Sequence, residues 1–153
     1  MNLDEQPLFR ILASLDLPAD DFIIAGSGPM LAHGIRSTLG DLDVVARGAA
    51  WDMALTLGTP SPAPLGYVDH IVLHSGEIEI LDGWFDYDAD KVIDEFETFC
   101  GIRFAPLGKV LEWKKRLDRE KDREDIDAIN RYMNDGKRDQ ANERIERALR
   151  EAE

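Results

Sequence analysis

Short apolar runs are the feature that most restricts how this 153-residue chain can fold. Phe22-Ile23-Ile24-Ala25 is too short for a buried helix and ends at Gly26, so it predicts a buried strand. Comparable runs predict further strands at 42–46, 67–73, 77–81 and 99–104. Apolar residues with helical spacing predict helices at 8–15, 30–35, 51–57 and 92–96. This alternation predicts an α/β (α+β) fold, a small mixed sheet flanked by helices.

The C-terminal third has a helical pattern throughout. Pro106 begins one helix, a second is expected at 122–133, and the charged tail from Arg138 has one apolar face. That tail is either a solvated helix or a helix that binds a partner. We expect one domain over residues 1–153, with a core at about 22–105 and a C-terminal helical extension at about 106–152.

Composition limits the function classes. The 31 acidic and 18 basic residues give a net charge of −13, which disfavours a phosphate-rich polymer as partner but not a nucleotide neutralised by metal. The single Cys100, which we expect to be buried, excludes an intrachain disulfide and fits a reducing compartment. We expect neither a signal peptide nor a membrane span, and therefore a cytoplasmic protein.

Three features in chain order carry the candidate chemistry. The Gly26-Ser27 turn leads from a strand into a helix, and its backbone N–H groups and hydroxyl suit an anionic oxygen. Asp41 and Asp43 stand at the start of the next strand, where residues two apart share a face, so their carboxylates are expected to converge. Glu79 lies between two isoleucines in a later strand, and Glu77 on the same face competes with it.

These residue types together suit phosphoryl chemistry. Convergent carboxylates repel each other unless a cation lies between them, and hard oxygen ligands suit Mg²⁺ or Mn²⁺. A third carboxylate on a neighbouring strand is then a base for an attacking hydroxyl or a ligand of a second metal. Each feature alone is more typical of a plain turn, a solvated strand edge or an exposed hairpin face than of a functional site. Their order and short spacing favour a functional site.

Two stretches resemble a known family. Gly26-Ser27 followed by Arg36-Ser37-Thr38-Leu39-Gly40-Asp41-Leu42-Asp43 resembles the signature of the nucleotidyltransferase (polymerase β-like) superfamily. The form is similar to minimal nucleotidyltransferases and to the abortive-infection type IV toxin group. Leu111-Glu112-Trp113-Lys114 and the run from Arg119 to Ile126 resemble that group's lysine-bearing helix and its Arg-x-Lys-Asp-x-x-Asp run. Gly28-Pro29 is less familiar in the family, and Glu79 stands where an Asp is commoner.

The resemblance implies a nucleotidyltransferase fold and a metal-dependent reaction. A nucleoside monophosphate would pass from a nucleoside triphosphate such as ATP to a hydroxyl or similar acceptor, with release of pyrophosphate. It implies metal binding by Asp41 and Asp43, with Glu79 as a further catalytic residue. The triphosphate would be bound by residues from the turn, the following segment and the later helix: Gly26, Ser27, Arg36, Thr38 and Lys114.

The acceptor stays open. A small molecule, such as an aminoglycoside-like or lincosamide-like compound, competes with a tRNA or protein in a toxin–antitoxin system, which would add an antitoxin partner. The acidic composition favours a small or basic acceptor.

Lys114 falls on the apolar stripe of its helix, where an ammonium needs a polar cleft or an anion, and the triphosphate or the aspartate pair would supply one. Lys115 is turned about 100° away and should face solvent. Asp122 and Asp125 share a helix face, and we expect Lys121 and Asp122 to position that helix through ion pairs.

Two other functions compete with this one. A strand, Gly26-Ser27-Gly28 and a helix imitate the start of a dinucleotide-binding module, although Leu31 takes the place of the third glycine. A non-catalytic nucleotide-binding regulator of the same fold is the other alternative.

The histidines carry no strong signal. His70 and His74 share a strand face, but their spacing does not favour a metal site, and the position of His33 favours a core or capping role over substrate contact.

Overall fold

The computed structural model describes residues 2–64 and 66–152, which form two compact units, Met1–Val110 and Leu111–Glu153. Over these residues the α-helices are α1 (Pro7–Ser14), α2 (Gly28–Ala32), α3 (Gly48–Ala54), α4 (Ala89–Asp94), α5 (Leu107–Leu117) and α6 (Glu120–Glu151). The strands are β1 (Phe22–Ala25), β2 (Leu42–Ala46), β3 (Ser61–Pro62), β4 (Asp69–Leu73), β5 (Ile78–Leu81), β6 (Glu97–Phe99) and β7 (Ile102–Phe104). Short 3-10 turns are η1 (Leu3–Glu5), η2 (Ala19–Asp21) and η3 (His74–Gly76).

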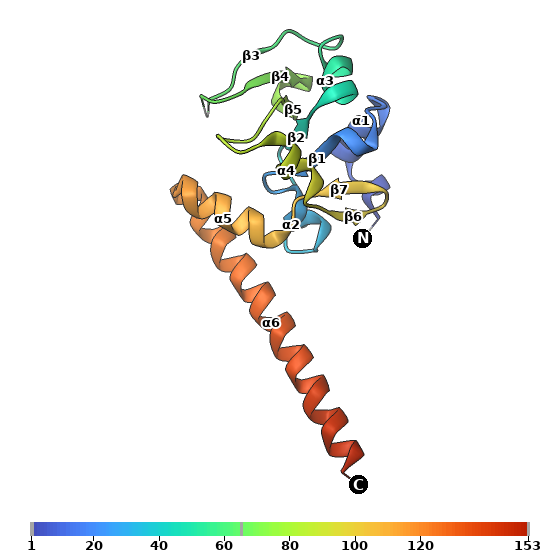
Figure 1. Cartoon of the computed structure of the whole chain (residues 1–153), viewed down its shortest axis with the longest axis vertical. Coiled ribbons are helices and arrows are strands. Elements are labelled where there is room, and N and C mark those ends of the chain that lie inside the picture. Colours follow the sequence, from blue (N-terminus) through green and yellow to red (C-terminus); the bar gives the residue numbers. More distant parts are fainter. Residues whose placement is uncertain (1, 65, 153) are drawn as a thin grey trace. The chain divides into compact units, whose positions relative to one another are not determined.

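A mixed sheet is the centre of the first unit (Figure 1). Over the described residues its seven strands lie in the order β3-β4-β5-β2-β1-β7-β6. β2 pairs antiparallel with β1 and parallel with β5, and β4 returns antiparallel along β5. On the other side β1 runs parallel to β7, which forms a hairpin with β6. The predicted α/β class and mixed sheet are confirmed.

The central strands are buried on both faces. Leu42 and Val44 of β2 belong to a core that includes apolar side chains of α1 and α3. On the opposite face Ile23 and Val45 are also fully buried, and α4 packs against β1 and β2. Full burial of a Val, Leu or Ile side chain stabilises a fold by about 1.5–3 kcal/mol, so this double-sided core fixes the register of β1 and β2.

Arg47 secures the end of β2. Its guanidinium lies 2.7 Å from Asp94, 3.0 Å from Asp90 and 3.5 Å from Asp21, so one side chain joins α4 and η2 to the sheet. The hydrogen bond to Asp94 is the main cause that raises the pKa of Arg47. The same bond is the main cause that lowers the pKa of Asp94. Arg47 therefore stays charged and holds α4 against β2.

The segment predicted as one edge strand at 99–104 is instead part of a hairpin. β6 and β7 are joined at Cys100 and Gly101, whose φ angles of +53° and +75° suit a tight two-residue turn. Cys100 is exposed on this turn, so the prediction that it is buried is wrong. The proline-rich segment from Thr59 to Pro64 contains a short strand, β3, whose edge position tolerates Pro62 because no ladder hydrogen bond is required on its outer side.

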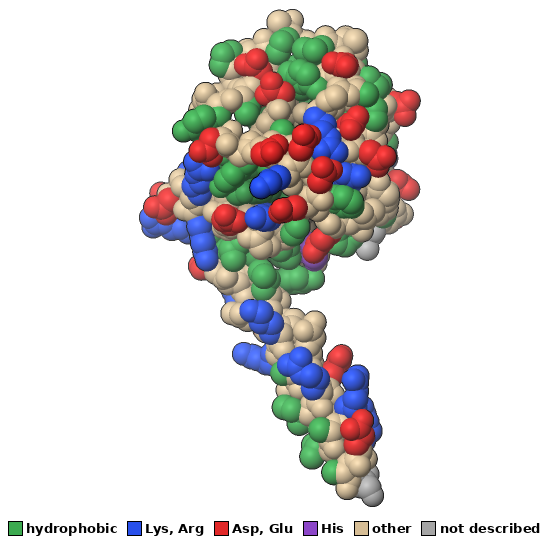
Figure 2. All heavy atoms as spheres, viewed as in Figure 1, with side chains coloured by type: hydrophobic (Ala, Val, Ile, Leu, Met, Phe, Trp, Pro, Cys, Tyr) green, Lys and Arg blue, Asp and Glu red, His purple; other side chains and the backbone are tan. Residues whose placement is uncertain are grey.

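The second unit contains most of α5 and the long helix α6. α6 is continuous over 32 residues where separate helices were expected at 122–133 and from Arg138. Gly136 costs a helix only about 1 kcal/mol, and Glu143 and Glu146 each precede an Arg by four residues, a spacing that supports helix. From Asn134 to Ala152 every side chain is exposed except the half-buried Ala141, and both charged and hydrophobic side chains are visible along this part of the helix (Figure 2). None of the helices within residues 2–64 and 66–152 combines the length and the hydropathy that a membrane span requires.

Candidate functional site

Three segments meet at one edge of the sheet. β1 ends at Ala25 where its antiparallel neighbour β2 begins, and β5 begins beside β2 because these two strands are parallel. Asp43 is the Cα partner of both Ala25 and Glu79, and Glu79 is in turn the partner of Val72 on β4. In-register residues of a sheet project to the same face, so the side chains of this row share one side.

Gly26 lies directly against the Asp43 carboxylate. Its φ is +60°, a left-handed conformation that favours glycine, and a Cβ atom built here would overlap Oδ2 of Asp43 and lie 3.2 Å from its Cγ. The turn therefore needs glycine both for its backbone and for the close approach of this carboxylate. Ser27 follows as a half-buried residue and precedes α2.

Glu79 is the carboxylate in register with Asp43. It is half-buried between the fully buried Ile78 and Ile80, which point to the opposite face. Its Oε1 accepts a hydrogen bond from Nδ1 of His70 on β4 at 2.6 Å. Glu77 is exposed and precedes β5, where its backbone carbonyl accepts the Leu42 N–H at 2.8 Å. The register thus brings Glu79, rather than Glu77, beside Asp43.

The carboxylates at this edge are oxygen donors of the kind that hold Mg²⁺ in proteins. Among the residues that the structure describes, no group of three or more His, Cys, Asp or Glu side chains forms a ready-made metal cage. Mg²⁺ is usually held by one or two carboxylates together with substrate phosphates and water, so a ready-made cage is not required. Asp43 and Glu79 lie on strands that are about 4.8 Å apart, where two anions repel each other unless a cation is present.

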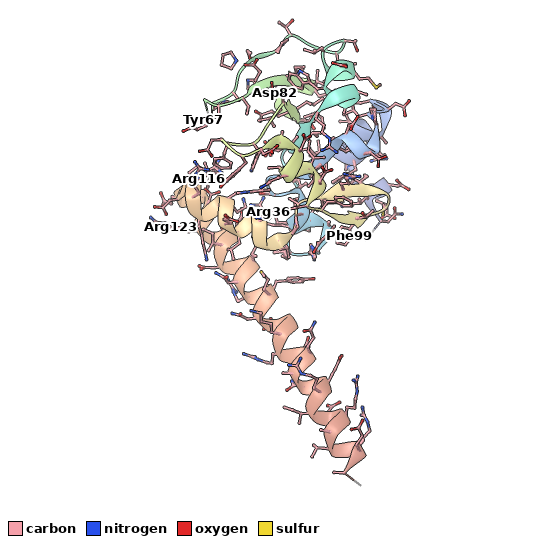
Figure 3. All side chains as sticks on the ribbon, viewed as in Figure 1. Arg36, Tyr67, Asp82, Phe99, Arg116 and Arg123 are labelled. Carbon is pink, nitrogen blue, oxygen red and sulfur yellow. The ribbon has the colours of Figure 1, made fainter. Side chains whose placement is uncertain are left out.

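The segment between α2 and β2 carries the remaining residues expected in the first unit. Arg36, labelled in Figure 3, is half-buried and its backbone N–H donates to the carbonyl of Met30 at 3.2 Å. Thr38 and Asp41 are exposed. Because β2 begins at Leu42, Asp41 lies just outside the strand, so its convergence with Asp43 stays a prediction.

Lys114 belongs to the second unit, where it is buried in an ion-pair cluster. Its ammonium donates to Asp125 at 3.0 Å and lies 3.7 Å from Asp122, while Arg119 pairs with Asp122 at 2.7 Å. Lys114, Asp122 and Asp125 are nearly inaccessible to solvent, with exposed fractions of 7%, 1% and 6%. The ion pairs predicted for Asp122 are present, and Lys115 is exposed as expected.

Burial of Asp122 alone would raise its pKa, but the hydrogen bonds and charge of Arg119 and the charge of Lys114 outweigh it and hold that pKa below its usual range. Arg116 and Arg123 lie at the same end of this unit, where α5 gives way to α6 (Figure 3). The role of Lys114 at the phosphates stays a prediction.

Two neighbours of the expected residues escaped the sequence analysis. The sequence favours no metal role for His70, yet this residue hydrogen-bonds Glu79, because the antiparallel register of β4 and β5 places it two residue pairs away from Glu79 on the same face. Asp125 was noted only for its helix face, and it is the closest partner of Lys114. The i, i+3 spacing of Asp122 and Asp125 after a lysine-bearing helix was the available signal for that cluster.

Comparison of the chain with protein-family models, with curated proteins and with solved structures finds no match. The antiparallel pairing of β1 and β2 argues against a dinucleotide-binding module, which requires a parallel βαβ unit.

Proposed function

We propose that this chain is a metal-dependent nucleotidyltransferase that moves a nucleoside monophosphate from a nucleoside triphosphate to a hydroxyl or similar acceptor. The observation that carries the proposal is the position of the Asp43 carboxylate, which lies against the Gly26 turn and in register with Glu79. A turn that binds phosphate next to two carboxylates is electrostatically unfavourable unless a divalent cation accompanies the phosphate. Enzymes that transfer groups from nucleoside triphosphates need this combination of a phosphate-binding turn and a divalent cation held by carboxylates.

The residues divide the work as follows. Asp43 and Asp41 would hold Mg²⁺ (or Mn²⁺), which supplies neutralisation of the charge that develops on the phosphates. Gly26, Ser27, Arg36 and Thr38 would bind the triphosphate. The oxygen of the acceptor forms a bond to the α-phosphorus, the bond from that phosphorus to the pyrophosphate oxygen breaks, and pyrophosphate leaves with the electron pair. Glu79 would take the acceptor proton or complete a second metal site.

The test is a calorimetric titration with each nucleoside triphosphate in the presence of Mg²⁺. We expect binding by the wild-type chain that is lost in Asp43→Asn and in Asp41→Asn, because a metal site that loses one of its carboxylates is weakened. Asp52→Asn is the charge-matched control, since Asp52 is exposed on α3. Unchanged binding in both site variants would refute the metal assignment.

Turnover is tested separately. Incubation with each labelled triphosphate, Mg²⁺ and cell extract should transfer label to an acceptor, with a small molecule expected before tRNA or protein. Glu79→Gln should lower kcat far more than it lowers triphosphate affinity, because a base acts mainly in the transition state. Glu77→Gln should change neither quantity. Binding without any transfer of label would instead favour a nucleotide-binding regulator.

A further inference from the structure

The hydrogen bond between His70 and Glu79 adds a residue to the proposed site. Within the described residues, 2–64 and 66–152, His70 is the only side chain that hydrogen-bonds Glu79, at 2.6 Å from Nδ1 to Oε1. The two side chains are 14% and 23% exposed, so both are shielded without being closed off. A carboxylate can only accept, so Nδ1 of His70 carries the hydrogen.

The strand register explains why these two side chains meet. His70 is the Cα partner of Leu81 and Val72 is the partner of Glu79, so His70 and Glu79 are diagonal neighbours on one face. Asp43 is on the same face, on the strand at the other side of β5. Glu79 is thus flanked by a carboxylate on β2 and an imidazole on β4. Val72 is 50% exposed, which leaves this face accessible to solvent beside the pair.

A glutamate in this position needs such a partner. Its carboxylate is joined to the backbone through three rotatable bonds and would otherwise occupy several positions. The bond from His70 fixes Oε1, which leaves Oε2 as the atom that can take a proton or bind metal. A displacement of about 1 Å at a reacting group can cost about a hundredfold in rate, so fixing this carboxylate has a large effect on catalysis.

We propose that His70 is a positioning residue that holds Glu79 in its working orientation beside Asp43. The proposal rests on the proposed nucleotidyltransferase function and assigns His70 no contact with substrate. Partners that hydrogen-bond metal-ligating side chains typically contribute tenfold to a hundredfold, and we expect an effect of this size for the partner of Glu79.

The molecule contains its own control. His33 and Glu97 form a second imidazole–carboxylate pair of nearly the same length, 2.7 Å, with the imidazole 16% exposed. This pair joins the end of α2 to β6, and His33 also packs edge-on against Phe99. If His70 only ties two strands together, the two histidines should respond alike to substitution.

The first measurement needs no turnover. The chain has three histidines, so the imidazole signals of ¹⁵N-labelled protein can be assigned one by one. Glu79→Ala should move the His70 signals and leave those of His33 in place, which also reports that the variant is folded. His70 signals that do not respond would overturn the proposal.

The second measurement uses the labelled triphosphate, Mg²⁺ and the cell-extract acceptor. His70→Ala should lower kcat by about tenfold to a hundredfold with little change in the KM for triphosphate, whereas His33→Ala should leave kcat unchanged. His70→Asn should recover much of the loss, because its amide N–H can stand near the position of Nδ1. Equal losses in the two alanine variants, or no recovery by Asn, would overturn the role of His70. An inactive wild-type chain would overturn the proposed function itself, which distinguishes the two failures.

Discussion

The substitution Gly26→Ala, which adds a single methyl group, is the most direct test of the site. Gly26→Ala should lower the free energy of unfolding by about 1–2 kcal/mol for the left-handed backbone. The substitution should also abolish Mg²⁺–triphosphate binding, because the new Cβ would displace the Asp43 carboxylate. Urea unfolding and calorimetry of the same variant measure the two effects.

Two other glycines separate backbone strain from the collision. Gly34 has a φ of +77° but open space around it, so Gly34→Ala should lose stability and keep triphosphate binding. Gly40 has neither constraint, so Gly40→Ala should change neither property. If Gly26→Ala binds as tightly as Gly34→Ala, the Asp43 carboxylate is not essential for binding.

For single residues, the sequence predicts the face on which a side chain lies when its chain neighbours determine that face. It does not predict a contact that depends on how two strands are paired. Glu79 is predictable because Ile78 and Ile80 fix the face on which it lies. His70 is not, because its contact with Glu79 depends on which residues of β4 and β5 are paired. No periodicity in a single strand contains that information.

The junction of α5 and α6 is an element held by buried charge. Lys114→Met should destabilise the helical unit by about 3–5 kcal/mol, because Asp125 and Asp122 would keep their burial and lose a cation. Lys115→Met is the matched control on the exposed side of the same helix and should change stability by no more than about 0.5 kcal/mol. Urea unfolding followed by far-UV circular dichroism compares the two. Equal effects would contradict a stabilising role for the cluster.

The same cluster predicts how stability responds to acid. The pKa of Asp122 is below its usual range in the folded state, so the carboxylate stabilises the fold above the unfolded pKa of about 3.9. This contribution is lost as the pH falls through the lowered folded pKa. Asp122→Asn should therefore flatten the fall in stability below about pH 4, as measured by urea unfolding at several pH values. Asp127→Asn, at an exposed position of α6, should show the same loss of stability in acid as the wild type.

Helices and strands match their predicted ranges where buried residues give the sequence a clear apolar pattern. Phe22–Ala25 is fully apolar and is followed by Gly26, and Leu42–Ala46 is apolar except for Asp43; both strands begin and end as predicted. The hairpin of β6 and β7 was missed because Cys100 takes a left-handed conformation that is uncommon for residues other than glycine. The continuity of α6 was missed because its exposed half has only a narrow apolar face and is supported by charge spacing instead.

Over the whole molecule the charge is unevenly distributed along the chain. Met1–Val110 has 6 basic and 18 acidic residues, a net charge of −12, whereas Leu111–Glu153 has 12 and 13, a net charge of −1. Acidic side chains are spread over the visible face of the first unit (Figure 2). The unit that contains Asp43 and Glu79 therefore repels polyanions and attracts cations.

This asymmetry makes the class of acceptor testable. At about 50 mM salt the wild-type chain should bind a tRNA-sized RNA more weakly than the roughly 10⁻⁴–10⁻⁶ M typical of non-specific nucleic-acid binders. It should bind a small polyamine more tightly, with an affinity that falls as salt screens the acidic unit. Fluorescence anisotropy and calorimetry measure the two affinities.

The alternative is that basic residues of α6 bind RNA locally despite the net charge. A chain truncated after Asp135, which lacks five of these basic residues in an exposed part of the helix, isolates that contribution. Tight RNA binding by the full chain that the truncation abolishes would identify α6 as an RNA-binding element and would move the expected acceptor from a small cation to RNA.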